Sequence, residues 1–177
     1  MRIELARPGD AGELAAVAAR TFPLACPPWS RPRDIAAFVD TNLSAACFTT
    51  YLSDPDRALF VARDGDRIVG YAMLIRGVPD DDNIQRAVPV RPAVELSKMY
   101  LLPEFHRTGV AAALMEAALA EATAWGARCM WLGTNEKNER AVRFYAKFGF
   151  TINGAKTFQM GEFVEDDHVM VRELDPQ

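Results

Sequence analysis

Residues 101–111 read LLPEFHRTGVA, and they mark the place where a strand ends, a short loop turns and a helix begins. The start of a helix leaves its first N–H groups without partners and carries partial positive charge, so it favours an anion. Gly109 and Ala111 are small enough to let a ligand approach the backbone, no acid lies between His106 and Met115, and Arg107 adds positive charge. The stretch therefore predicts a seat for a phosphate group.

The spacing of the glycines in this loop excludes two common nucleotide sites. A nucleoside-triphosphate loop needs Gly-x-x-x-x-Gly-Lys followed by Ser or Thr, and a dinucleotide fingerprint needs Gly-x-Gly-x-x-Gly. Residues 101–111 fit neither pattern. The expected guest is another phosphate compound.

Outside this loop, hydrophobic periodicity and turn residues predict an alternation of strands and helices. The expected strands are 2–5, 59–62, 68–74, 93–102, 129–134, 150–160 and 168–174. The expected helices are 11–22, 31–39, 109–125 and 138–147. Residues 76–92 are rich in Pro and Asp and are expected to form a surface loop. The order predicts an α/β (α+β) fold with a mixed central β-sheet and helices on both faces. At 177 residues we expect a single domain, 1–177.

The composition limits the class of protein and of partner. Half of the residues are apolar and a quarter are charged, which is typical of a folded chain. The formal charge of −4 argues against a nucleic-acid partner, because that affinity comes largely from clustered Lys and Arg. Cys26, Cys47 and Cys129 lack the paired spacing of a zinc or redox site, so we expect no metal and a reducing compartment. No stretch predicts a signal peptide or a membrane span, and a cytoplasmic protein with no membrane partner is expected.

Two motifs resemble those of the GNAT superfamily of acyl-CoA N-acyltransferases. The pyrophosphate loop of that family reads Gln/Arg-x-x-Gly-x-Gly/Ala, and residues 106–111 match it except that His106 replaces the usual Gln or Arg. A second family motif is Asn-x-x-Ala-x-x-x-Tyr-x-x-x-Gly-Phe, and it is matched by Asn138, Ala141, Tyr145, Gly149 and Phe150. The C-terminal half further resembles the PaiA-type polyamine N-acetyltransferase branch. The shared positions are Trp131-Leu132-Gly133, Glu136-Lys137-Asn138-Glu139, Phe144-Tyr145, Gly149-Phe150, Gly154-Ala155 and Met160-Gly161.

The resemblance implies a GNAT-like sheet whose strands part at an acetyl-CoA site. Its backbone at Met99, Tyr100 and Leu101 would pair with the pantetheine arm as an added strand, and one such N–H would polarise the thioester carbonyl. The implied cofactor-binding residues are Met99, Tyr100, Leu101, His106, Arg107, Thr108, Gly109, Val110, Ala111, Ala112, Asn138 and Tyr145. Each of these positions also has a purely structural interpretation. Met99 and Leu101 fit core residues, and His106 fits a residue that shapes the loop. Asn138 fits a helix N-cap.

Two side chains have chemistry that acyl transfer to an amine needs. An aliphatic amine of pKa about 10 is mostly protonated at neutral pH and must lose a proton before it attacks. Glu95 lies eleven positions before His106, where several branches of the superfamily place a catalytic glutamate, and it reads otherwise as a solvated strand carboxylate. Tyr145 holds the position at which the family donates a proton to the departing thiolate, and it reads otherwise as a core aromatic.

The expected function is transfer of an acetyl group from acetyl-CoA to a primary amine, either a polyamine or another small amine, by direct attack. An amino acid, an antibiotic or a protein N-terminus is an alternative acceptor, and a non-catalytic acyl-CoA sensor is an alternative function. Cys129 has no base nearby in the sequence, which disfavours an acyl-cysteine route, and His168 reads as an ordinary strand residue. The acidic runs at 80–82 and 162–167 would attract a polycation or serve only as solvated loops. The acceptor, the acyl-chain preference and the oligomeric state, a homodimer included, stay open.

Overall fold

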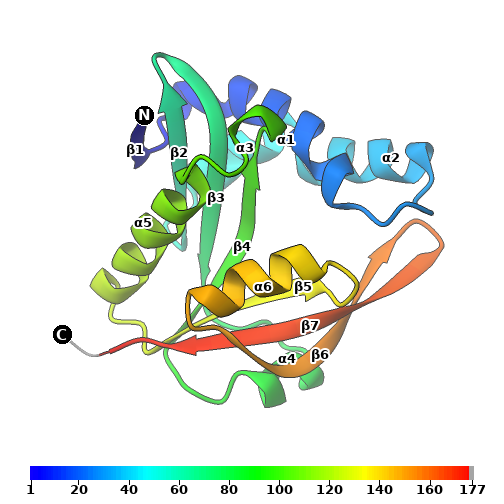
Figure 1. Ribbon diagram of the computed structural model, residues 1–177, viewed down its shortest axis with the longest axis vertical. Helices are drawn as coiled ribbons and strands as arrows, with labels where there is room; N and C mark the ends of the chain where they lie inside the picture. Colours follow the sequence, from blue (N-terminus) through cyan, green and yellow to red (C-terminus); the bar gives the residue numbers. More distant parts are fainter. Residues whose placement is uncertain (176–177) are drawn as a thin grey trace. The chain divides into compact units, whose positions relative to one another are not determined.

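The structure, a computed structural model that describes residues 1–175, contains one seven-stranded sheet in the order β1-β2-β3-β4-β5-β7-β6 (Figure 1). The strands are β1 (Arg2–Leu5), β2 (Arg57–Asp64), β3 (Arg67–Arg76), β4 (Ala93–Leu101), β5 (Cys129–Asn135), β6 (Thr151–Met160) and β7 (Phe163–Glu173). The helices are η1 (Pro8–Asp10), α1 (Ala11–Ala25), α2 (Pro32–Asn42), α3 (Ala45–Ser53), α4 (Asp82–Ala87), η2 (Pro103–Phe105), α5 (Val110–Ala124) and α6 (Glu139–Lys147). Strand β4 runs parallel to β5, whereas β1–β2, β5–β7 and β7–β6 are antiparallel. The predicted mixed α/β fold is confirmed.

The chain divides into two compact units, and each contains a piece of β3, β4 and α5. The first unit comprises residues 1–74 and 98–118, and the second comprises residues 75–97 and those from 119 onward. The single domain 1–177 stays a prediction. No helix among residues 1–175 is both long enough and apolar enough to cross a membrane.

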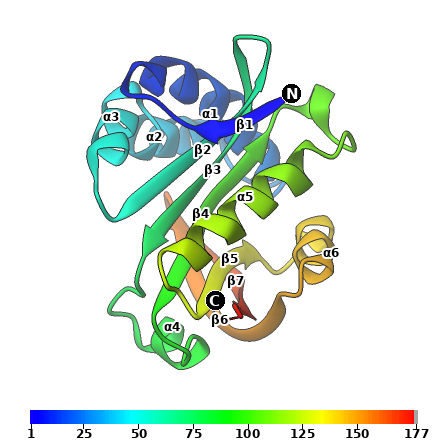
Figure 2. The same cartoon turned by 90° about the vertical axis from the view of Figure 1, so that its left-hand side faces the viewer.

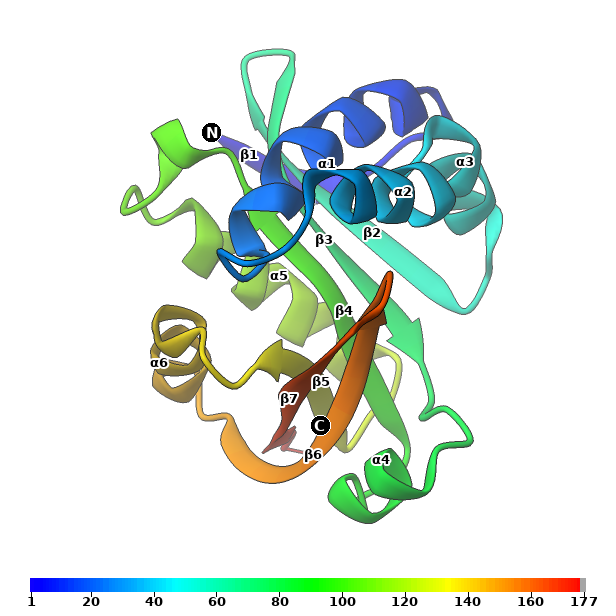
Figure 3. The same ribbon diagram turned by 90° about the vertical axis from the view of Figure 1, so that its right-hand side faces the viewer.

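In the first unit, helices cover both faces of the strands. Helices α1, α2 and α3 lie on one face and the first part of α5 lies on the other (Figures 2 and 3). The core between them is fully buried at Leu14, Phe48, Tyr71 and Leu114. Phe48 belongs to α3, a helix that the sequence pattern does not predict, because only this one residue of α3 is buried and the helix shows little apolar periodicity.

A buried arginine joins β2 to the start of the chain. Arg63 is only 5% exposed, and its guanidinium contacts Glu4 Oε1 at 2.6 Å and Asp10 Oδ2 at 2.6 Å. The hydrogen bond from Arg63 holds the pKa of the Glu4 carboxyl below its usual range. Burial opposes ionisation of Asp10, but hydrogen bonds from Arg63 and from the Arg7 N–H still lower the pKa of Asp10. Ionised Glu4 and Asp10 therefore stabilise the first unit.

We expect Arg63→Met to lower the free energy of unfolding by about 3 kcal/mol, because it leaves the buried Asp10 carboxylate without its partner. The pKa values of both carboxyls are depressed, so their contribution is present at neutral pH and is lost as the pH falls below about 4. Urea unfolding of the wild type and of the variant, measured at pH 7 and at successively lower pH, should show that their difference in free energy of unfolding becomes smaller below about pH 4. Arg2→Met is the control, since Arg2 makes an exposed contact of 4.0 Å with Asp66 and should cost under ~1 kcal/mol. An equal deficit for Arg63→Met at every pH would contradict the ion-pair explanation.

In the second unit, β5, β7 and β6 form an antiparallel sheet with α6 over one part of it and α4 beside β6 and β7 (Figure 1). The core next to α4 consists of Ile84, Ala87, Val88, Ala93, Cys129, Trp131 and Val169. The expected surface loop 76–92 is therefore partly wrong. Asp81 caps a short helix there, accepting hydrogen bonds from the N–H groups of Asn83 and Ile84, and Ile84 anchors that helix in the core.

Candidate active site

The loop between β4 and α5 has an unusual backbone. Arg107 has φ 64° and Gly109 has φ 87°, so two of three consecutive residues are left-handed. Arg107 is the only described non-glycine residue with positive φ. Left-handed geometry costs about 1–2 kcal/mol at a residue with a side chain, so Arg107 is held there by its surroundings. The loop therefore has a defined backbone conformation, with left-handed geometry at Arg107 and Gly109.

Hydrogen bonds to neighbouring carbonyls fix this loop on the first unit. The Leu102 N–H donates to Val69 O at 2.9 Å, which ties the end of β4 to β3. The His106 ring lies with Nε2 3.0 Å from Leu101 O, and the Thr108 hydroxyl donates to Phe105 O. His106 and Thr108 therefore have structural contacts in the loop, and their contact with a coenzyme stays a prediction.

Helix α5 begins at this loop with its N–H groups free to meet a ligand. The first helical hydrogen bond runs from the Ala113 N–H to Gly109 O at 3.1 Å, so the N–H groups of Val110, Ala111 and Ala112 have no partner within the helix. The first turn of α5 contains no acid. Ala111 and Ala112 are partly exposed, and Arg107 is exposed. This arrangement suits an anion with several oxygens, such as a pyrophosphate.

The end of β4 packs in the same unit. Leu101 is 9% exposed, and the Tyr100 ring lies 5.8 Å from the ring of Tyr71 and 6.4 Å from that of Phe22. A side chain on Gly70 would come within 3.0 Å of Tyr100 O, so this glycine permits the close approach of β3 to β4. The side chains of Tyr100 and Leu101 thus take part in packing, and a coenzyme contact of the β4 backbone there stays a prediction.

The second unit carries Glu95, Asn138 and Tyr145. Glu95 lies in β4 opposite Trp131 of β5, and the parallel pairing of these strands covers only three residue pairs, from Ala93–Cys129 to Glu95–Trp131. Directly opposed residues share a sheet face, so Glu95 lies on the face of Trp131. The structure therefore ends the β4–β5 ladder at the proposed base.

Asn138 and Tyr145 lie at the two ends of α6. The side-chain carbonyl of Asn138 accepts a hydrogen bond from the Ala141 N–H at 3.2 Å, so Asn138 is the N-cap of this helix. The Tyr145 ring contacts Phe144 and Phe150, with centroids 5.5 Å and 6.0 Å away. Burial raises the pKa of the Tyr145 phenol to about 12, so this group keeps its proton at neutral pH. A proton or hydrogen-bond donor is the role that such a phenol can fill.

Two other kinds of catalytic group, a nucleophilic cysteine and a metal centre, find little support among residues 1–175. Cys129 is buried in β5, and desolvation raises the pKa of its thiol, which disfavours the nucleophilic thiolate. Among residues 1–175, no group of three or more His, Cys, Asp and Glu side chains is placed to hold a metal ion. Direct attack by the acceptor fits these residues better than a covalent intermediate on Cys129.

An ion pair lies over a bare glycine on the β5–β7–β6 sheet. Lys156 of β6 and Asp167 of β7 are directly opposed, with Nζ 3.2 Å from Oδ2, and both side chains are largely buried. A Cβ on Gly133 of β5 would lie 2.3 Å from Lys156 Cε and 3.4 Å from Asp167 Oδ2. Gly133 therefore leaves the space that this ion pair occupies. No sequence pattern indicates this ion pair, because the contact depends on strand register.

The chain is similar to known acetyltransferases in sequence and in fold. The family model for the acetyltransferase (GNAT) family matches residues 18–150. An uncharacterised N-acetyltransferase of Mycobacterium tuberculosis H37Rv is 62% identical over 165 residues, which cover 93% of this chain and 98% of the relative.

Two solved structures share the fold. The structure of a PaiA N-acetyltransferase from Thermoplasma acidophilum in complex with coenzyme A matches with a TM-score of 0.75 and 19% identity, over 98% of this chain and 99% of that one. The ribosomal-protein-S18-alanine N-acetyltransferase from Escherichia coli matches with a TM-score of 0.69 and 17% identity, over 99% and 95%. At these identities the likeness extends to the fold alone.

Proposed function

The chain belongs to the acetyltransferase (GNAT) family and is an N-acetyltransferase, and we propose that it transfers the acetyl group of acetyl-CoA to a small primary amine, with a polyamine as the leading acceptor. One observation carries the coenzyme half of this proposal. The left-handed residues Arg107 and Gly109 bracket a loop that opens onto the acid-free start of α5. In the proposal, the N–H groups of Val110, Ala111 and Ala112 bind the pyrophosphate, with Arg107 adding charge.

The thioester end of the coenzyme is assigned to the backbone of Met99, Tyr100 and Leu101. A pantetheine arm offers amide groups that pair with a strand as another strand would. The early end of the β4–β5 ladder, after Glu95 and Trp131, supports a sheet that accepts such an insertion. A backbone N–H of β4 would then stabilise the charge that develops on the thioester oxygen.

Proton transfer is assigned to Glu95 and Tyr145. Glu95 acts as the base that removes a proton from the ammonium form of the acceptor, directly or through a water molecule. The phenol of Tyr145, with its pKa of about 12, is a weaker acid than an ordinary thiol of pKa about 8.5. Complete transfer of its proton to a free thiolate is therefore uphill, and Tyr145 acts mainly by donating a hydrogen bond to the sulfur while negative charge develops there.

The acceptor follows from charge and from the PaiA-type resemblance. The formal charge of −4 attracts cations, and the β6–β7 hairpin carries Glu162, Glu165 and Asp166 beside Asp167, which is paired with Lys156. We place the chain nearest the PaiA-type polyamine branch, as a single domain in the cytoplasm, where its three free cysteines stay reduced. A homodimer is compatible with this assignment. The E. coli enzyme named above makes a protein N-terminus the second candidate acceptor.

The test is release of coenzyme A thiol from acetyl-CoA with a panel of amines, with each product identified by mass. The panel contains spermidine, putrescine, a free amino acid and a peptide with an alanine N-terminus. Turnover with the polyamines at the highest kcat/KM is expected. A preference for the peptide would replace the polyamine by a protein N-terminus. Acetyl-CoA binding without turnover on any amine would favour a coenzyme sensor instead of an enzyme.

A further inference from the structure

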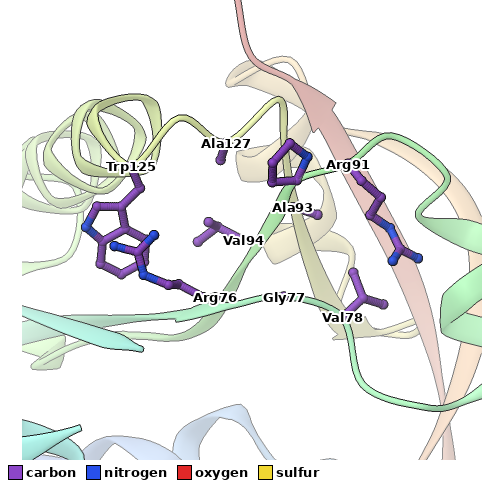
Figure 4. A pocket seen from close by; sticks show the side chains of 9 residues that line it. Arg76, Gly77, Val78, Arg91, Ala93, Val94, Trp125 and Ala127 are labelled. Carbon is purple, nitrogen blue, oxygen red and sulfur yellow. The ribbon is translucent and has the colours of Figure 1, made fainter. Parts of the chain in front are cut away.

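A cavity of about 320 Å³ opens in the second unit among the ends of β3 and α5 and the start of β4 (Figure 4). Its walls include Val78, Val94 and Ala127, and two arginines, Arg76 and Arg91, contribute to its lining. Ligand pockets have volumes of about 300–1,000 Å³ and combine apolar walls with a few polar groups, so this cavity is large enough for a small organic molecule. It contains none of the residues assigned to acetyl transfer.

The guanidinium of Arg76, one of the lining residues, stacks on an aromatic ring. Its guanidinium carbon lies 4.0 Å from the centroid of the Trp125 ring, and Figure 4 shows the two groups stacked at one end of the cavity. Trp125 follows the last residue of α5, where the partial negative charge of the helix end also favours a cation. Stacking occupies the flat face of the guanidinium and leaves its N–H edge available for a carboxylate.

Arg91 also lines the cavity, but Figure 4 shows its guanidinium directed away from Val94 and Ala127. Its Nε donates to Val88 O and its Nη2 donates to Gln85 Oε1, each at 2.8 Å. Within residues 1–175, no ion pair is made by Arg76 or by Arg91, and no Asp or Glu is among the residues that line the cavity. The cation that the cavity offers to a ligand is therefore Arg76, and no acid of the lining competes for it.

We propose that this cavity binds a small carboxylate with a flat or branched apolar body. The carboxylate meets the N–H edge of Arg76, and the apolar body lies against Val94, Val78 and Ala127. An apolar body favours this cavity because burial of its surface adds to the charged contact. The inference rests on the cavity alone and is independent of the amine acceptor and of the acetyl transfer reaction.

The test uses benzoate as the probe and titrates it into the whole protein by calorimetry, with benzamide as the neutral probe of the same shape. Benzoate is expected to bind at least tenfold more tightly than benzamide, and Arg76→Gln should weaken benzoate at least tenfold while leaving benzamide unchanged. Arg86→Gln is the matched control, because Arg86 is an exposed arginine of the same unit that contacts Asn83 and lies outside the cavity.

A third variant tests whether the probes bind inside the cavity, independently of the charge of Arg76. Ala127→Leu adds volume to the apolar wall and should weaken both probes, with thermal unfolding checking that the variant is folded. Three results would overturn the proposal. They are equal affinity for benzoate and benzamide, an Arg76→Gln variant that binds benzoate as the wild type does, and no heat of binding at about 10 mM benzoate. In each case Arg76 would serve only to complement the end of α5.

Discussion

Replacing Tyr145 with Phe is expected to lower kcat by about 100-fold, because positioned proton donors contribute roughly 10²- to 10⁴-fold to such reactions. The ring contacts with Phe144 and Phe150 are kept in the variant, so folding and acetyl-CoA binding should change little. The lost interaction strengthens only as charge develops on sulfur, and kcat should fall more than KM rises. Steady-state kinetics at saturating amine and acetyl-CoA measure this.

The pH dependence gives a second readout for Tyr145. Because burial raises its pKa to about 12, the phenol is protonated throughout the neutral range and its donor role is lost only as the pH rises toward 12. The kcat of the wild type should therefore show no alkaline decline from this group below about pH 11. Tyr51→Phe is the control for loss of a phenol, since Tyr51 donates to Asn42 O in the first unit and is not among the residues assigned to the reaction. Unchanged turnover of Tyr145→Phe at saturation would remove Tyr145 from the mechanism.

The second large effect is expected at Gly109. Its φ of 87° lies where a β-branched residue is strained by about 1–3 kcal/mol, although a Cβ there would meet no atom within 4 Å. Gly109→Val should therefore change the backbone conformation of the loop without a steric clash. Because the loop is the proposed pyrophosphate site, the Kd for acetyl-CoA should rise at least tenfold. Gly65→Val is the matched control, because Gly65 in the β2–β3 turn also has positive φ (63°) and open space around it.

Calorimetric titration with acetyl-CoA and thermal unfolding separate the two glycines. Both variants should lose similar stability, and only Gly109→Val should lose acetyl-CoA affinity. Equal Kd values for the two variants would mean that the loop is not the coenzyme site. Retained binding by Gly109→Asn would support the backbone explanation, since Asn tolerates left-handed geometry better than Val.

The sequence predicts those parts of the molecule that depend on neighbours along the chain. The helix after Gly109 begins at Val110, within one residue of the prediction, because the loop and the small residues after it are local signals. Asn138 as a cap is likewise a local feature and was among the predicted alternatives. Helix α3 was missed because its helical state depends on burying Phe48 against Tyr71, a contact that is tertiary.

The candidate site likewise contains local features that the sequence predicts and tertiary contacts that it does not predict. The two family motifs indicate residues 106–112 and Tyr145 from the sequence alone. No motif indicates how these residues assemble with an acceptor. The Arg76–Trp125 stack and the Lys156–Asp167 pair join residues distant in the sequence, through helix ends and strand register. Such contacts have no periodicity, and neither alternation nor spacing indicates them.

Gly133 has an evolutionary consequence. Any side chain at this position displaces the Lys156 stem, which a Cβ would meet at 2.3 Å, and pulls its ammonium away from the buried Asp167 carboxylate. Displacement of the flexible lysine is easy, but removing the partner of a buried carboxylate costs about 3–5 kcal/mol. We therefore expect positions 133, 156 and 167 to change together among homologues, with a side chain at 133 accompanied by a shorter residue at 156 and a neutral one at 167.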